Sequence, residues 1–97
     1  MKGVMAVTSA ASIGDLDELQ RLFSAGIDLN EGDYDMRTGI HIAASEGHLE
    51  AVECFIEKNV DINPKDRWGG TPLADAKREG HKAVLELLKK HGGAEKA

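Results

Sequence analysis

The feature that most constrains this chain of 97 residues is an internal repeat with a period of 33 residues. The second and third copies match at Thr38 and Thr71, at Ala43 and Ala76, and over Glu46-Gly47-His48 and Glu79-Gly80-His81. The first copy follows the same frame at Ala10-Ala11-Ser12 and Gly14. So many matches in a single frame predict one domain, over residues 1–97, made of three similar units. The units are expected at about 5–32, 33–65 and 66–94.

Each unit is predicted to contain a polar turn followed by two helices. The first helix is short and rich in small residues, and it is expected to end near Gly14, Gly47 or Gly80. The second helix is amphipathic, with apolar residues at positions i, i+3, i+6 and i+7, which predicts one buried stripe. Those residues are Leu16, Leu19, Leu22 and Phe23 in the first copy, and Leu49, Val52, Phe55 and Ile56 in the second. Because two helices cannot bury their faces alone, the copies must stack.

Two segments carry a family resemblance. The runs Thr38-Gly39-Ile40-His41-Ile42-Ala43-Ala44 and Thr71-Pro72-Leu73-Ala74 resemble the Thr-Pro-Leu-His-x-Ala motif of ankyrin repeats. The resemblance implies an all-α fold, an ankyrin-repeat solenoid of three stacked helix-turn-helix repeats. It also implies that His41 holds its turn by hydrogen bonding. The chain departs from the motif at Gly39, where proline is usual, and at Ala74, where histidine is usual.

Charged residues at both ends of the array predict polar capping faces. In the last copy, apolar positions of the middle copy are replaced by Asp75, Lys77, Lys82 and Lys89, and in the first copy they are replaced by Glu18 and Arg21. Burying such charges against a further repeat would be costly, so we expect them to face water and the array to end here. We therefore expect a monomer or, through the oppositely charged ends, weak self-association.

Composition and charge exclude several classes of function. Hydrophobic residues make up 41% and charged residues 30%, as in an ordinary soluble domain. The net charge of −5 argues against nucleic acid as a partner, because backbone binding needs a basic surface. No stretch approaches 18 consecutive apolar residues, so no membrane partner is expected. The single cysteine, Cys54, excludes an internal disulfide framework and predicts an intracellular, cytoplasmic location.

No catalytic, cofactor-binding or metal-binding constellation is evident, so we predict that the chain is not an enzyme. His48 and His81 occupy equivalent repeat positions at helix starts, which indicates a structural role. Cys54 lies among apolar neighbours and is expected to be buried and inert. The aspartates of the turns lack the spacing of a calcium-binding loop, and the chain has no phosphate-binding or dinucleotide motif.

The turn tips and the exposed side of the first helices are the positions that do not serve the core. Aromatic residues and arginine there are typical of protein interfaces. The expected partner-binding residues are Tyr34, Met36, Arg37, Arg67, Trp68 and Arg78. For Trp68 two interpretations stand side by side: the indole stacks over the adjacent turn, for example against Tyr34 of the preceding repeat, or it contacts a partner.

The turn sequences carry a second, narrower resemblance. Asp33-Tyr34-Asp35-Met36-Arg37-Thr38 and Asn63-Pro64-Lys65-Asp66-Arg67-Trp68 are similar to the C-terminal ankyrin module of glutaminases and of ankyrin-bearing asparaginases. They also resemble the ankyrin segment of plant integrin-linked, Raf-like kinases. We therefore expect a non-catalytic protein–protein interaction module that binds a partner protein or an intramolecular domain. The alternative is a regulatory or oligomerisation module of a larger enzyme, such as a glutaminase-type amidohydrolase.

Overall fold

The fold is all-α, as a computed structural model that describes residues 3–95 shows. These residues form six helices and no strand. The helices are α1 (Val4–Ile13), α2 (Leu16–Ser24), α3 (Gly39–Glu46), α4 (Leu49–Glu57), α5 (Pro72–Glu79) and α6 (Lys82–Lys90). The predicted all-α class is therefore confirmed. The limits of the three repeats, at 5–32, 33–65 and 66–94, stay a prediction.

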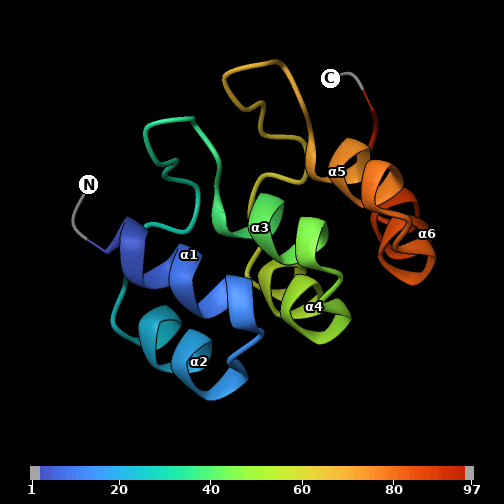
Figure 1. Cartoon of the computed structure of the whole chain (residues 1–97). Helices are drawn as coiled ribbons and strands as arrows, with labels where there is room; N and C mark the ends of the chain where they lie inside the picture. The colour runs from blue at the N-terminus through green and yellow to red at the C-terminus, as the bar shows by residue number, and fades with distance from the viewer. Residues whose placement is uncertain (1–2, 96–97) are drawn as a thin grey trace.

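The helices pair in sequence and the pairs stack side by side (Figure 1). The first helices form one row, in which α1 packs against α3 and α3 packs against α5. The second helices form another, in which α2 contacts α4 and α4 contacts α6. Long loops before α3 and before α5 project from the same side of the stack (Figure 1). Any function carried by these loops therefore lies on a common surface.

Glycines end the first helix of each pair, as the sequence predicts. Gly14, Gly47 and Gly80 follow α1, α3 and α5 with φ of 68°, 77° and 77°, in the left-handed region where a side chain would be strained. The backbone N–H of each glycine donates to carbonyls of the last helical turn. The chain can then reverse within two residues and begin the second helix.

The predicted apolar stripe of the second helices is confirmed. Leu19, Leu22, Val52 and Phe55 are buried in one continuous core, and the remaining stripe residues pack against it partly buried. The rings of Phe23 and Phe55 meet edge to face, with their centroids 5.4 Å apart. Alanines of α1, α3 and α5 are buried between the pairs, and their small side chains allow the helix rows to approach closely.

The ring of Phe55 explains why glycine, and not the usual proline, stands at position 39. A Cβ atom placed on Gly39 would lie 2.5 Å from Cζ of Phe55 and 2.8 Å from Cγ1 of Val7. In the last pair, Pro72 and Leu88 occupy the two equivalent positions. The middle pair therefore combines a larger side chain on α4 with a smaller residue on α3.

The predicted polar caps are confirmed in part. The side chains of Arg21, Lys77, Lys82 and Lys89 are exposed, as expected for faces without a neighbouring repeat. The expectation that Asp75 faces water is wrong, because that residue is 1% exposed and its carboxylate is bound by arginines.

The first helix also departs from the expected polar cap. α1 exposes two apolar side chains, Met5 and Ile13, on its outer surface. The capping substitutions at Glu18 and Arg21 lie on α2, and α1 has no acidic residue in its first turn and no basic residue in its last. The first helix pair is therefore charged on its second helix alone.

We predict that Gly39→Pro, although it restores the usual motif, destabilises the chain by about 2 kcal/mol, because the ring of Phe55 occupies the added volume. Combining it with Phe55→Leu, which copies the Pro72–Leu88 arrangement, is expected to recover most of that loss. Equilibrium urea unfolding of the two single variants and the double variant measures the coupling. Strictly additive effects would show that the two positions are independent.

Candidate functional site

Two projecting turns, over residues 33–37 and 66–70, are each organised by an aspartate. Oδ1 of Asp33 accepts hydrogen bonds from the backbone N–H groups of Asp35 and Arg37, at 2.9 and 3.0 Å. Oδ1 of Asp66 repeats the arrangement with the N–H groups of Trp68 and Gly70, at 2.9 and 2.7 Å. A short side chain that satisfies two backbone donors fixes the turn. The turn tips are therefore ordered by the chain itself.

The two turns are also joined to each other. The backbone N–H of Arg67 donates to the carbonyl oxygen of Asp35 at 2.8 Å. An Nη1–Oδ1 ion pair at 3.4 Å links the same two residues through their side chains. The side chains of Arg67 and Asp35 are 64% and 44% exposed, so the ion pair contributes little energy.

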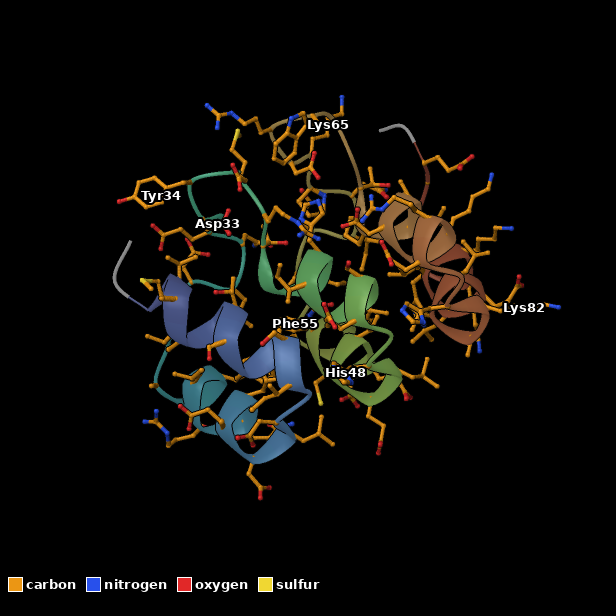
Figure 2. All side chains as sticks on the ribbon, in the orientation of Figure 1. Asp33, Tyr34, His48, Phe55, Lys65 and Lys82 are labelled. Atoms are coloured by element: carbon orange, nitrogen blue, oxygen red, sulfur yellow. The ribbon has the colours of Figure 1, made fainter. Side chains whose placement is uncertain are left out.

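Three large apolar side chains stand exposed on these tips. Tyr34 is 89% exposed, Met36 59% and Trp68 71%. Figure 2 shows the ring of Tyr34 pointing away from the body of the molecule. The ring contact found within residues 3–95 joins Phe23 and Phe55, so Trp68 does not stack on Tyr34. Stacking of Trp68 on Tyr34 is therefore wrong, whereas stacking of the indole over the adjacent turn stays a prediction.

Met36 adopts an unusual backbone conformation. Its φ is 60°, and the equivalent residue of the next turn is Gly69, with φ of 81°. A residue with a side chain costs about 1–2 kcal/mol in the left-handed region, whereas glycine does not. The turn therefore carries a methionine at its tip at the cost of backbone strain. The sequence does carry a signal for this conformation, because the position of Met36 is occupied by glycine in the next copy.

The structure places Arg37 differently from the other expected contact residues. Its side chain is 24% exposed, and its Nη2 lies 3.1 Å from Oδ2 of the buried carboxylate of Asp75. Nη1 of Arg78 binds the other oxygen, Oδ1, at 2.9 Å. The pair formed by Arg37 and Asp75 spans the middle and last repeats. Arg37 is thus a tie beneath the turns, and the expectation that it lies free on the surface is wrong.

His41 holds the base of both turns, as its place in the motif implies. Its Nδ1 accepts a hydrogen bond from the backbone N–H of Thr38 at 3.1 Å. This leaves the proton on Nε2, which donates to the carbonyl oxygen of Gly70 at 2.9 Å. The buried imidazole therefore connects the start of α3 to the end of the following turn.

His41, Asp66 and Asp75 bring three possible metal ligands within 4.8 Å of one another. Each of them already has protein partners. The imidazole is bonded at both nitrogens, Asp66 accepts two backbone N–H groups, and each oxygen of Asp75 accepts from an arginine. A cation would have to displace these donors next to the guanidinium of Arg37. The cluster therefore serves as a structural polar core.

The remaining histidines and the cysteine have structural explanations too. Nε2 of His48 bonds the carbonyl oxygen of Ser12 at 3.1 Å, and Nε2 of His81 bonds that of Ser45 at 3.0 Å. Cys54 is half-buried rather than fully buried, and burial together with the nearby carboxylate of Glu57 raises the pKa of its thiol. A raised pKa leaves less of the reactive thiolate.

Comparison with known proteins gives two matches. Residues 7–97 match the family described as "Ankyrin repeats (3 copies)". A stretch of 40 residues is 50% identical to potassium channel KOR2 of Oryza sativa subsp. japonica, covering 41% of this chain and 6% of the channel. Ankyrin repeat domains are typically non-catalytic. None of the helices in residues 3–95 is long and apolar enough to cross a membrane.

We predict that Arg37→Met destabilises the chain by about 2 kcal/mol, because it leaves the buried carboxylate of Asp75 with one partner. Arg78→Met is the matched control, and it is expected to cost under about 1 kcal/mol since that arginine is 58% exposed. Combining Arg37→Met with Asp75→Ile should recover much of the loss. Isoleucine is the residue at the equivalent position of the middle repeat, Ile42. Urea unfolding measures all three. Equal costs for the two arginine variants would contradict the assignment.

Proposed function

The chain belongs to the ankyrin repeat family, whose members generally act as protein–protein interaction modules, and we propose that it binds a partner through its turn tips. We call this the turn-tip surface and define it by Tyr34, Met36, Arg67 and Trp68. The partner is another protein or a domain of the same polypeptide. The chain contributes shape and charge complementarity and no chemistry of its own.

The exposure of three large apolar side chains on ordered turns carries this proposal. Tyrosine and tryptophan are enriched among the residues that dominate interface energies. They are usually costly to leave exposed, and here they have no ring partner within residues 3–95. Because Asp33 and Asp66 already hold the turns, binding does not have to pay for ordering them.

The strain at Met36 supports the same surface. Backbone strain that the fold does not need is often found where a side chain must be presented to a ligand. The next turn shows that glycine fits this position without strain. Position 36 has an exposed methionine in place of that glycine. Because methionine is flexible and polarisable, this favours contact with a partner over a role in stability.

The three arginines have different roles in this proposal. Arg67 and Arg78 are exposed, and both already pair with carboxylates of this chain. Charges of this kind at the rim of an interface orient a partner more than they add affinity. Arg37 is a positioning residue, since its contact with Asp75 lies beneath the turns.

A second candidate is a regulatory or oligomerisation module within a larger protein. The match to the potassium channel favours this second candidate. The matched stretch covers 6% of the channel, so a similar segment lies there within a much longer chain. The narrower expectation of a glutaminase-type amidohydrolase stays a prediction. In this second case the partner of the turn-tip surface is a domain of the same polypeptide.

We predict that Tyr34→Ala/Trp68→Ala abolishes capture of the partner from a lysate of the source, while circular dichroism remains unchanged. Met5→Ala/Ile13→Ala is the matched control, because it also removes two large exposed apolar side chains, from a different surface. A photo-crosslinking amino acid at position 34 should label the same partner, and one at Glu57 on α4 should not. Capture of the same proteins by both double variants would contradict the proposal.

The strain at Met36 gives a test that separates binding from folding. We predict that Met36→Gly leaves the free energy of unfolding unchanged or raises it by up to about 1 kcal/mol, since glycine relieves the left-handed strain. The same change should weaken binding of the captured partner several-fold. Urea unfolding and a titration of that partner measure the two effects. A clear loss of stability would show that Met36 is a structural residue.

A further inference from the structure

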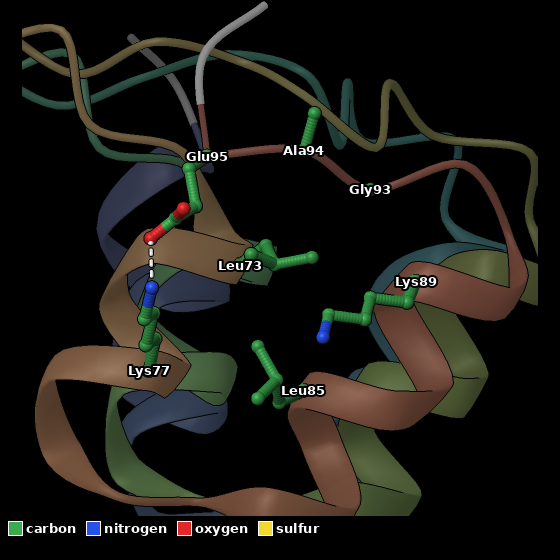
Figure 3. A pocket seen from close by; sticks show the side chains of 7 residues that line it. All are labelled: Leu73, Lys77, Leu85, Lys89, Gly93, Ala94 and Glu95. Atoms are coloured by element: carbon green, nitrogen blue, oxygen red, sulfur yellow. Dashed lines mark ion pairs between the residues drawn. The ribbon is translucent and has the colours of Figure 1, made fainter.

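A cavity of about 220 Å³ opens at the far end of the stack, between α5, α6 and the segment that follows α6. Leu73 and Leu85 form its apolar floor, and Gly93 and Ala94 form one wall (Figure 3). The charged residues Lys77, Lys89 and Glu95 complete the lining. It lies away from the projecting turns, so an inference about it stands apart from the turn-tip surface.

The repeat frame shows why the cavity exists. In the first two copies, two apolar residues after the second helix pack against the core; they are Ile27 and Leu29, and Val60 and Ile62. In the last copy the same two positions are Gly93 and Glu95. The cavity therefore lies where the earlier copies have aliphatic side chains.

The backbone keeps its path although the side chains are missing. The N–H of Ala94 donates to Oδ1 of Asn63 at 2.9 Å, as the N–H of Asp61 donates to Oδ1 of Asn30 at 2.8 Å. The hydroxyl of Thr71 donates to the carbonyl oxygen of Ala94 and adds a second tie. The segment is thus held in register, and it does not collapse to fill the space.

The charged side chains at the rim of the cavity, Lys77, Lys89 and Glu95, carry one net positive charge. Nζ of Lys77 lies 2.9 Å from Oε1 of Glu95, so a carboxylate is already bound at one side. The ammonium group of Lys89 points across the cavity from the opposite side (Figure 3). Residues 65–97 carry eight basic and five acidic side chains, whereas residues 1–64 carry four and twelve. This end of the stack is therefore basic within an acidic chain.

We propose that this cavity is a second docking site, which takes one aliphatic side chain from an acidic segment of another protein. The aliphatic group would occupy the volume that Val60 and Ile62 fill in the preceding repeat, over Leu73 and Leu85. A flanking carboxylate would pair with Lys89. An apolar cavity of about 150 Å³ accommodates a benzene molecule, so a leucine-sized group fits with room for water at the opening.

Methyl resonances of Leu73 and Leu85 in the full chain test the proposal directly. The probe is a pentapeptide with a central leucine between two pairs of glutamates. It is expected to shift both methyl groups with a dissociation constant of about 1 mM, as for one shallow contact. A peptide with alanine at the centre, and one with lysines in place of the glutamates, should each bind at least about tenfold more weakly.

Three variants complete the test. Lys89→Glu should weaken binding of the probe about tenfold, and Lys90→Glu, on the same helix but outside the cavity, about twofold at most. Glu95→Ile restores the residue of the preceding repeat, so it should fill the cavity, raise the melting temperature and abolish the methyl shifts.

Two results would overturn the proposal. The first is the absence of methyl shifts at about 10 mM probe, or equal shifts with the alanine peptide, since either shows that the cavity takes no aliphatic group. The second is concentration-dependent dimerisation of the chain without peptide, removed by Lys89→Glu. That result would assign the cavity to the acidic first repeat of a second copy.

Discussion

The stack depends on an interlock between a glycine of one repeat and a histidine of the next. The ring of His48 lies against Gly14, where a Cβ atom would come within 2.9 Å of it, and the ring of His81 lies still closer to Gly47, at 2.5 Å from such an atom. Each ring also bonds the carbonyl group two residues before that glycine, at Ser12 or Ser45. Glycine is required twice over, because the helix ends there with positive φ and because the imidazole occupies the space beside it. This contact fixes the separation of neighbouring helix pairs at the ends of α1 and α3.

The turn-tip surface inherits its geometry from that register. His41 reaches the carbonyl group of Gly70, and Arg37 reaches the carboxylate of Asp75, only because α3 and α5 lie at a fixed separation. These two buried contacts cross from the middle repeat to the last beneath the loops. The adjacent tips are joined above them by the backbone contact between Asp35 and Arg67. A surface built from two loops can therefore be as ordered as one built on helices, which favours binding with little loss of conformational entropy.

Most of the fold could be predicted from the sequence, because everything that repeats in the frame is visible in it. The helix ends at Gly14, Gly47 and Gly80 and the apolar stripes follow from matched positions, and the role of His41 follows from its place in the ankyrin motif. The exposure of Tyr34 and Trp68 could also be predicted, because the repeat frame places both residues on turn tips, which do not serve the core.

The burial of Asp75 could not be predicted from matched positions. In the frame it replaces Ile42, and a charge at an apolar position at the end of an array indicates a solvent-facing cap. Its partner, Arg37, corresponds in the next turn to Gly70, so this pair occurs once and has no periodic signal. Interactions between non-matching positions of neighbouring repeats need coordinates.

The departures from the repeat divide into two kinds, and the division bears on function. Some are compensated by another change within reach: the missing Cβ of Gly39 by the ring of Phe55, and the carboxylate of Asp75 by Arg37. Others have no compensating change within residues 3–95, namely the strained Met36 at a glycine position and the loss of the aliphatic side chain at Gly93. Compensated departures preserve the packing of a stack. Uncompensated ones lower stability without a benefit inside the fold, and contact with a partner supplies a physical reason for them.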